Sequence, residues 1–285
     1  MVIPTGKNIH ESHYSILFTL RSILSQTVQP ASVTIVENMP GLGVQEEVMK
    51  FYGNRVSVIT GIEKSPNIAY ARNVGASRSD SGIIVFMDDD VILGYTDYFA
   101  RIISIMDNND FCCGAKRYWT PTKWFDSISL DNQFKHNLMI LKDISYLPHS
   151  FERSTGEKNC SEFSYIGHFG AIKREVFHQI KGFDEDYEGW LYQDTDLMMR
   201  LVNEGYTYEI LAYTDLFCFH LNHPAEKSRY QQINRAKFYE KMDQLNIYFN
   251  RRNFFGDFES NDRSVLVRRV SQRVGDSTHQ AAPEH

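Results

Sequence analysis

Apolar and polar positions in the first ninety residues follow two alternating patterns. Some segments carry apolar side chains at every third or fourth position, which is typical of amphipathic helices. Others are short β-branched or continuously apolar runs, which are typical of buried strands. Helices are expected at residues 13–27, 43–51 and 68–79, and strands at residues 2–3, 32–36, 56–60 and 82–87. This alternation predicts βαβ units and therefore an α/β fold with a mostly parallel sheet.

The pattern is less regular after residue 90. Residues 91–110 have helical spacing, whereas residues 111–165 mix aromatic side chains with polar and turn residues. Regular structure is expected again in residues 163–174, in a helix over 192–203, in a strand over 208–212 and in a long amphipathic helix after Pro224. We expect one domain over residues 1–224, a helical extension over 225–275 and a disordered tail over 276–285.

Composition excludes several classes of protein. Of 285 residues, 42% are hydrophobic and 23% are charged, as in ordinary globular domains, and the net charge of −6 argues against nucleic acid as the main partner. No apolar run approaches the ~20 residues of a transmembrane helix, and the first residues lack the apolar core of a signal peptide. The cysteines have neither metal-finger spacing nor disulfide density, which favours reduced thiols in a cytoplasmic protein. They are Cys112, Cys113, Cys160 and Cys218.

Polar residues follow three of the predicted strands. Thr5, Glu37 and the run Asp88–Asp90 stand at the strand ends where open α/β sheets bind their ligands. In an extended chain the outer carboxylates of this run, Asp88 and Asp90, point to the same face. Such a pair suits Mg²⁺ or Mn²⁺, with substrate phosphates completing the coordination shell. The alternative interpretation is a solvated acidic turn.

Two further candidate residues, Asp194 and His220, lie a hundred or more residues after the acidic run. Asp194 stands in the first turn of a predicted helix, where the helix dipole favours an anionic carboxylate that could act as a general base. The alternative is that Asp194 and Asp196 only complement the helix dipole. His220 follows an apolar run and could supply a nitrogen ligand to Mn²⁺, although a single histidine is more often structural.

Taken in order, five sequence blocks resemble the GT-A glycosyltransferases, particularly family 2, and the last of them is also similar to galactosyltransferases. The blocks are IPT, VEN, NIAYARNVGA, IIVFMDDD and GFDE…GW…QD-x-DL-x-x-RL. The resemblance covers about residues 2–223. It implies a GT-A (Rossmann-like) sheet flanked by helices, with a nucleotide-binding half over residues 1–110 and an acceptor and catalytic half over 111–224.

The resemblance also implies a donor site and a metal site. Thr5 and Glu37 would lie against the nucleotide base, and Arg72 and Asn73 would lie beside the nucleotide. Asp88 and Asp89 would contact the donor nucleotide. The metal ligands would be Asp88, Asp90 and His220.

The later block implies the catalytic and acceptor side. Asp194 matches the usual catalytic base of inverting members. Trp190 would help to wall the sugar and acceptor pocket, and Gln193 and Asp196 would contact substrate. Glu is usual in the family at the position of Gln193, so recognition of the donor sugar could differ here.

The implied activity is metal-dependent transfer of a sugar from a nucleoside-diphosphate sugar, with UDP the expected nucleotide, to an acceptor hydroxyl with inversion. The acceptor could be a glycan, a lipid-linked molecule or a natural product. Retaining transfer and non-catalytic binding of a nucleotide sugar or glycan at a degenerate site are the alternatives. The Arg-rich residues 251–273 could touch anionic lipid or a partner subunit, for instance in a homo-oligomer; the alternative is a solvated helix.

Overall fold

The computed structural model describes residues 1–6, 15–64, 66–119, 166–211, 216–221 and 230–245. The described helices are α1 (Ser15–Leu24), α2 (Val44–Tyr52), α3 (Ile68–Ser77), α4 (Tyr98–Met106), α7 (Arg174–Gln179), α8 (Gln193–Asn203) and α9 (Gln231–Gln244), with a 3₁₀ turn at Gly53–Arg55. The described strands are β1 (Val2–Thr5), β2 (Thr34–Glu37), β3 (Ser57–Ile59), β4 (Ile83–Met87), β5 (Val91–Leu93), β6 (Phe111–Cys113), β7 (Ala115–Trp119), β8 (Phe169–Lys173), β9 (Tyr208–Ile210) and β10 (Phe217–Leu221).

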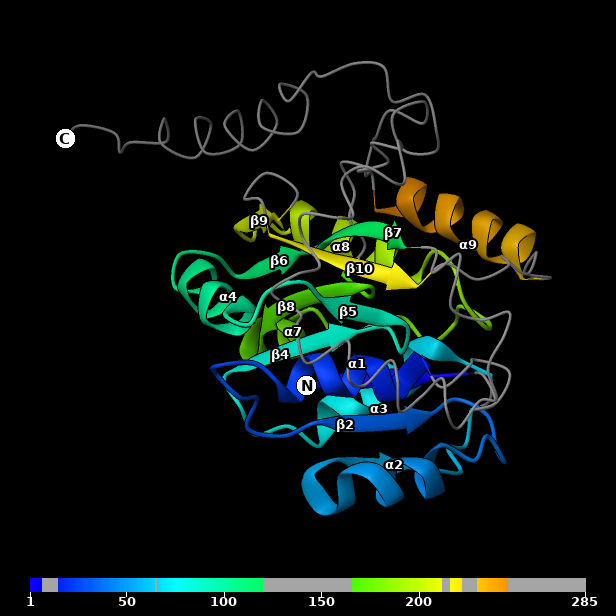
Figure 1. Ribbon diagram of the computed structural model, residues 1–285. Coiled ribbons are helices and arrows are strands. Elements are labelled where there is room, and N and C mark those ends of the chain that lie inside the picture. The colour runs from blue at the N-terminus through cyan, green and yellow to red at the C-terminus, as the bar shows by residue number, and fades with distance from the viewer. Residues whose placement is uncertain (7–14, 65, 120–165, 212–215, 222–229, 246–285) are drawn as a thin grey trace. The chain divides into compact units, whose positions relative to one another are not determined.

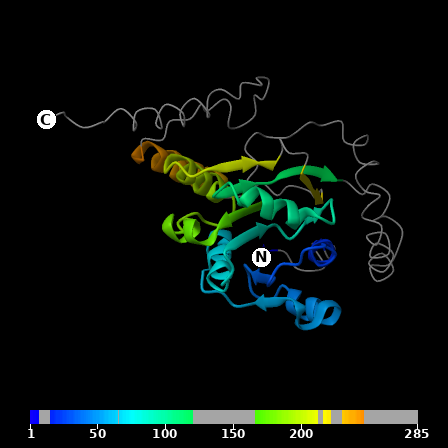
Figure 2. The same ribbon diagram turned by 90° about the vertical axis from the view of Figure 1, so that its left-hand side faces the viewer.

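Seven strands form the main sheet, in the order β3-β2-β1-β4-β8-β6-β9. The first four are parallel, β8 runs antiparallel to both of its neighbours, and β6 and β9 are parallel to each other. Figure 1 shows this succession from β2 upward to β9, and Figure 2 shows the same strands from the side. The predicted α/β fold with a mostly parallel sheet is therefore confirmed, with one reversed strand in its middle.

Both faces of the sheet are covered, which explains the uninterrupted apolar runs of its strands. Ile3 and Ile35 point to one face, into a core shared with α1, α2 and α4. Val2 and Val36 point to the other face, where they lie against Gly75 of α3. All four side chains are almost completely buried, so alternate residues of each strand stabilise opposite layers.

A second sheet has three strands in the order β5-β10-β7, and it bears on the candidate site. β5 begins directly after the acidic run Asp88–Asp90 and pairs antiparallel with β10. Its position is fixed against α1, because the Leu93 amide donates to Ser22 Oγ at 3.2 Å and Thr19 Oγ1 donates to the Asp89 carbonyl at 3.0 Å. The acidic run is thereby held as a short connection between two buried strands.

Most predicted elements occur where the sequence pattern places them, but the expectation of a helix over residues 91–110 is wrong at its beginning. Residues 91–93 are strand β5, and α4 starts only at Tyr98. The reason is tertiary: β10, more than a hundred residues later, supplies hydrogen-bond partners that outweigh the local spacing. The expected tail over 276–285 and the Arg-rich residues 251–273 lie outside the described residues.

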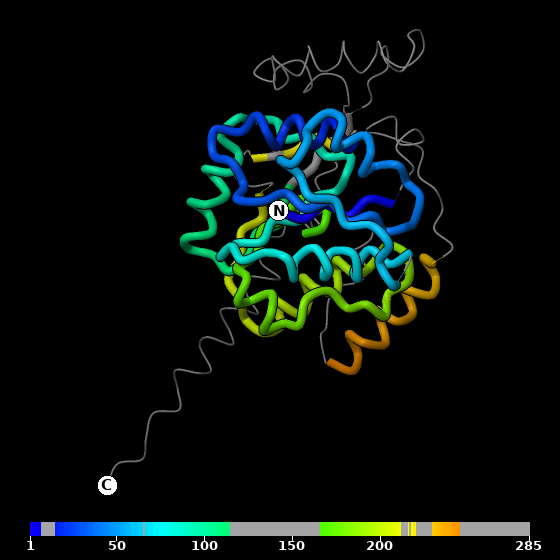
Figure 3. Tube along the Cα trace, turned by 90° about the horizontal axis from the view of Figure 1, so that it is seen from below, coloured from blue at the N-terminus to red at the C-terminus, as the bar shows by residue number. Residues whose placement is uncertain are grey.

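Three other findings bear on the sequence-based expectations. Cys112 and Cys113 are buried free thiols, and Cys218 is buried as well. Among the described helices, none has the length and apolar character needed to cross a membrane. The domain boundaries at residues 110 and 224 stay predictions. Helix α9 follows the second boundary and lies beside the segment that leads into α8 (Figure 3).

Gly75 gives a test of the packing between α3 and the sheet. A Cβ at Gly75 would overlap Val2 Cγ1 and press on Val36, and both β-branched neighbours are stiff. We expect Gly75→Ala to lower the free energy of unfolding by about 1–2 kcal/mol, because overpacking costs more than the ~1 kcal/mol that alanine gains over glycine in a helix. Urea denaturation measures it. Gly82→Ala is the control, since nothing lies within 4 Å of a Cβ there; equal stability of both variants would contradict the expectation.

Candidate active site

Strand register brings His168 to the acidic run. In the antiparallel pair β4–β8, Met87 lies opposite Phe169, so the next residues outward, Asp88 and His168, also face each other. The Asp88 amide donates to the His168 carbonyl at 3.1 Å, and the His168 ring forms a short hydrogen bond with the Asp88 carboxylate. The imidazole of His168 is thus hydrogen-bonded to Asp88, the first carboxylate of the acidic run.

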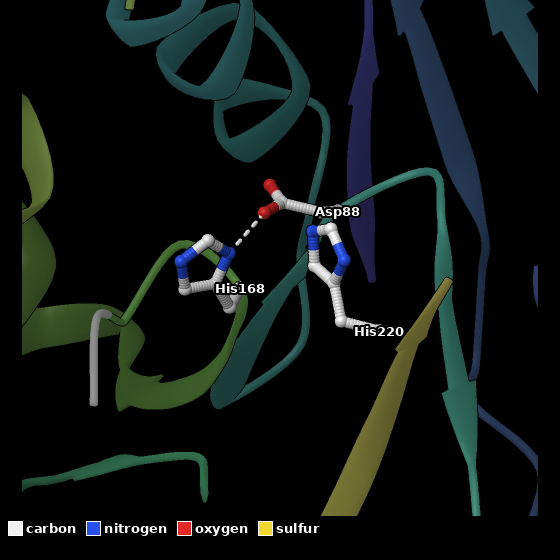
Figure 4. A group of neighbouring side chains, drawn as sticks. All are labelled: Asp88, His168 and His220. Atoms are coloured by element: carbon white, nitrogen blue, oxygen red, sulfur yellow. Dashed lines mark hydrogen bonds and ion pairs between the residues drawn. The ribbon is translucent and has the colours of Figure 1, made fainter. Parts of the chain in front are cut away.

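His220 approaches from the second sheet. It lies opposite Val91 in the β5–β10 pair, and its Nε2 is 3.3 Å from Asp90 Oδ1. The His168 and His220 rings meet edge to face, with centroids 5.7 Å apart. Figure 4 shows the side chains of Asp88, His168 and His220 converging from the end of β4, from the segment before β8 and from β10.

These three side chains form a candidate metal site. One carboxylate oxygen of Asp88 and one ring nitrogen each of His168 and His220 all lie within 4.8 Å of one another. The structure therefore brings together two of the three expected ligands, Asp88 and His220, and adds His168, which sequence reasoning missed. Asp90 lies next to His220, and its assignment as a ligand stays a prediction.

A single buried guanidinium connects this group to Asp194. Arg72 is only 1% exposed; its Nη2 is 3.0 Å from Asp88 Oδ1 and its Nη1 is 2.5 Å from Asp194 Oδ1. Its Cζ lies 5.2 Å from the centre of the Phe183 ring, on which it packs. Because one cation pairs with both carboxylates, the candidate metal ligand and the candidate base are held by the two terminal nitrogens of Arg72.

The same neighbours determine the charge of Asp88. Burial by itself raises the pKa of the Asp88 carboxyl, but the charge and hydrogen bond of His168 and the charge of Arg72 outweigh it, so that this pKa lies well below its usual range. Asp88 is therefore ionised at neutral pH, as a metal-binding carboxylate must be.

Gly167 makes this arrangement sterically possible. A Cβ at this position would overlap both the Arg72 guanidinium and Asp194 Oδ1. The short segment 166–168 thus does two things: its glycine leaves room for the Arg72–Asp194 pair, and its histidine reaches Asp88.

The expected nucleotide contacts divide into two kinds. Thr5 and Asp89 come together at the site, where Thr5 Oγ1 donates to Asp89 Oδ2 at 2.5 Å. Glu37 instead accepts the backbone N–H groups of Val44 and Gln45, at 3.1 and 3.3 Å, and so binds the N-terminus of α2. Glu37 Oε1 is therefore already engaged inside the protein. The position of Glu37 at a strand end does not by itself reveal this contact.

Asn73 and Asp196 are likewise engaged inside the protein. The Asn73 amide donates to the Phe183 carbonyl and to Glu185, both at 2.9 Å, and accepts from the Phe183 amide. Asp196 has no exposed area and is paired with Arg200 at 2.8 Å and Lys241 at 2.8 Å. The structure therefore does not bring the Asp196 side chain to a surface that substrate can reach.

Trp190 and Gln193 lie on the segment that leads into α8. Trp190 is 36% exposed and contacts the Tyr230 ring edge to face. Gln193 is 2% exposed, and among the described residues its Oε1 has no hydrogen-bond partner. A buried amide oxygen of this kind costs free energy unless a ligand or water donates to it.

Comparison with solved structures concerns the fold. S. aureus TarS 1-349 in complex with UDP-GlcNAc matches with a TM-score of 0.55 and 13% identity, over 86% of this chain and 64% of that one. The mannosyltransferase PcManGT from Pyrobaculum calidifontis, in complex with GDP-Man and Mn²⁺, gives 0.54 and 13%, over 99% and 75%. GalNAc-T7 with UDP, GalNAc and Mn²⁺ gives 0.56 and 13%, over 84% and 47%. The expected GT-A fold is confirmed by these likenesses.

Comparison of sequences identifies the family. A protein of Bacillus subtilis (strain 168) named "Uncharacterized glycosyltransferase YfnE" is 22% identical over 79% of this chain, which spans 65% of that protein's length. The profile of the N-terminal domain of galactosyltransferase matches residues 152–224, and that of glycosyl transferase family 2 matches residues 9–181. Because the latter covers more than half of the sequence, the chain belongs to glycosyl transferase family 2.

Proposed function

We propose that the protein transfers a sugar from a nucleoside-diphosphate sugar to an acceptor hydroxyl, with inversion at the sugar carbon. One observation carries this proposal: the candidate metal ligands Asp88, His168 and His220 are linked to the carboxylate of Asp194 through the buried guanidinium of Arg72. The proposed cation site for a diphosphate and the proposed base for a hydroxyl would thus be linked through one residue.

The residues present fit a divalent cation. Arg72 pairs with two carboxylates, Asp88 and Asp194, and the acidic run adds Asp89 and Asp90, so carboxylates outnumber the permanently charged cation that pairs with them here. The donor set of one carboxylate and two imidazoles favours a borderline metal such as Mn²⁺, whereas Mg²⁺ prefers oxygen ligands throughout. A bound divalent ion would neutralise the charge that develops on the leaving diphosphate.

The solved structures with this fold support the class of donor. TarS is in complex with UDP-GlcNAc, PcManGT with GDP-Man and Mn²⁺, and GalNAc-T7 with UDP, GalNAc and Mn²⁺. All three pair this fold with a nucleotide or nucleotide sugar. We propose a UDP-sugar as the donor here, with Thr5 and Asp89 at the nucleotide end of the site.

The chemical step assigned to Asp194 is proton removal. The Asp194 carboxylate would take the proton of the acceptor hydroxyl. At the same time the oxygen of that hydroxyl would form a bond to the anomeric carbon, from the face opposite the diphosphate. The bond between that carbon and the diphosphate oxygen breaks, and its electron pair leaves with the diphosphate. Arg72, fixed by Asp88 and packed on Phe183, would hold Asp194 in the orientation for this step.

Trp190 and Gln193 are proposed to contact the sugar or the acceptor. The exposed face of an indole suits the apolar face of a sugar ring. The Gln193 amide oxygen, buried and without a described partner, could accept a hydrogen bond from a hydroxyl of the substrate.

Metal-dependent nucleotide binding is the first test. We expect one of UDP, GDP and dTDP, with UDP the favoured one, to bind in the presence of Mn²⁺ and much less in its absence or with Mg²⁺. Isothermal titration calorimetry of the full chain with each nucleotide and each metal measures this. Binding of no nucleotide under any condition would contradict the proposed donor site, and equal binding with EDTA would contradict the metal.

Replacement of the proposed base separates chemistry from binding. Asp194→Asn should leave metal-dependent nucleotide affinity nearly unchanged and should lower the rate of sugar transfer by roughly 10²–10⁴-fold, the usual range for loss of a general base. Asp243→Asn, at an exposed position of α9, is the matched control. Turnover near the wild-type rate would refute the role of Asp194, and a product with retained configuration would refute inversion.

Gly167 tests whether the Arg72–Asp194 contact matters for catalysis. Gly167 does not have a left-handed backbone, so the added Cβ is the only change that alanine makes. We expect Gly167→Ala to push Asp194 off Arg72 and to lower the transfer rate by at least about tenfold, since displacements near 1 Å can cost that much or more. Steady-state kinetics measures this against Gly82→Ala, where a Cβ meets no atom. A wild-type rate in Gly167→Ala would show that the contact is dispensable.

A further inference from the structure

Helix α9 lies beyond residue 224, where both matching family profiles have ended. It nevertheless packs, within the same compact unit of residues 1–247, on the segment that carries Trp190 and leads into α8. We name this segment, residues 184–192, the pre-α8 segment. Figure 3 shows α9, in orange, running beside it.

Asn234 of α9 is the central contact. Its side chain is completely buried, and its Nδ2 donates to the backbone carbonyls of Glu188, Trp190 and Leu191 at 2.7, 3.1 and 3.2 Å. Its Oδ1 accepts from the Glu188 amide at 3.1 Å. One side-chain amide therefore binds four backbone groups of the segment, with its two N–H hydrogens shared among three carbonyls.

Two lysines of α9 make further contacts with the pre-α8 segment and with the start of α8. Lys237 Nζ donates to the Asp186 carbonyl at 2.6 Å. Lys241 Nζ is 2.5 Å from Asp184 and 2.8 Å from Asp196. Because Asp196 lies in the first turn of α8, Lys241 connects α9 to the helix start that carries Asp194.

The backbone of the pre-α8 segment needs such support. Leu191 and Tyr192 have φ values of 83° and 73°, a left-handed conformation that costs free energy in residues with a Cβ. The carbonyl of Leu191 is one of the groups that Asn234 binds, and the Tyr192 ring packs on Phe238 of α9 with centroids 5.6 Å apart. The strained residues are therefore those that α9 holds.

The opposite side of the segment is held by the start of α3. The Ile68 amide donates to the Gly189 carbonyl and the Gly189 amide donates to the Pro66 carbonyl, each at 3.1 Å. A Cβ at Gly189 would overlap the Tyr230 ring, so this glycine allows the close approach of the segment to the residue before α9. The pre-α8 segment is thus fixed from two sides, by α3 and by α9.

We propose that Asn234 and Lys241 of α9 are positioning residues for Trp190 and Asp194. This inference rests on the proposed function, because it takes Asp194 as the base. The nucleotide end of the site, at Thr5 and Asp89, has no described contact with α9. Loss of the α9 contacts should therefore lower the rate of transfer without weakening nucleotide binding.

The test uses Asn234→Leu in the full chain, because leucine keeps the volume and the apolar packing but makes no hydrogen bond. We expect kcat to fall by about ten- to a hundredfold, as for other displacements of catalytic groups, while the dissociation constant of the nucleotide with Mn²⁺ changes less than about twofold. Hydrogen–deuterium exchange should become faster in peptides that contain residues 185–193 and stay unchanged in peptides from β4 and α3.

Two more variants keep the test decisive. Lys237→Ala removes the hydrogen bond to the Asp186 carbonyl and an exposed ion pair with Glu188 at 3.5 Å. It should give a smaller effect of the same kind even if Asn234→Leu does not fold. Gln232→Ala, at an exposed position of the same helix, should match the wild type in kcat, nucleotide affinity and exchange.

The possible outcomes decide between positioning and simple packing. A loss of kcat with faster local exchange and unchanged nucleotide affinity supports the proposal. Unchanged kcat, or a loss of kcat that follows a general loss of folded protein and nucleotide binding, overturns it. If the wild-type chain transfers no sugar, the proposed function fails, and unchanged exchange in the variants would then show separately that α9 does not hold the segment.

Discussion

The site depends on the burial of one positive charge. A guanidinium taken out of water must be paired and hydrogen-bonded, since its desolvation otherwise costs several kcal/mol. The two terminal nitrogens of Arg72 meet this demand with Asp88 and Asp194, which lie 16 residues after it and 122 residues after it in the chain, whereas its Nε has no hydrogen-bond partner among the described residues. The pairing ties the residue that follows β4 to the first turn of α8. It also accounts for Gly167, because a side chain at that position would occupy the space in which the two ions meet.

The same constraint explains why the candidate metal site and the candidate base are neighbours. Arg72 helps to keep Asp88 ionised, and the strand register that places His168 against Asp88 adds a second positive or hydrogen-bonding partner. A cation bound at the Asp88–His168–His220 group would take over part of the charge compensation that Arg72 now gives to Asp88.

Sequence patterns predicted the parts of this site that depend on local features. The apolar run of β4, the carboxylates that follow it, the α3 block with Arg72 and the first turn of α8 with Asp194 are all visible without coordinates. His168 was missed because nothing next to it marks it; it reaches Asp88 only through the register of two strands 80 residues apart. Glu37 and Asp196 show the opposite difficulty. A carboxylate at a strand or helix end can face a ligand or an internal donor, and here the α2 N-terminus and Lys241 are those donors.

Lys241 and Asn234 also change how the division of the chain is understood. The spacing of apolar residues after Pro224 predicted a helical extension outside the domain of residues 1–224, yet Asn234 of this helix binds both the N–H and the carbonyl of Glu188. Residues 184–192 include two non-glycine residues with left-handed backbone, Leu191 and Tyr192, and such conformations persist only where neighbouring structure holds them. Since the strained backbone lies immediately before Gln193 and Asp194, the contacts that hold it also set the direction in which α8 starts. The energetic cost of the strain is thus offset by α9, and the position of the proposed base follows from contacts made by a helix that neither family profile includes.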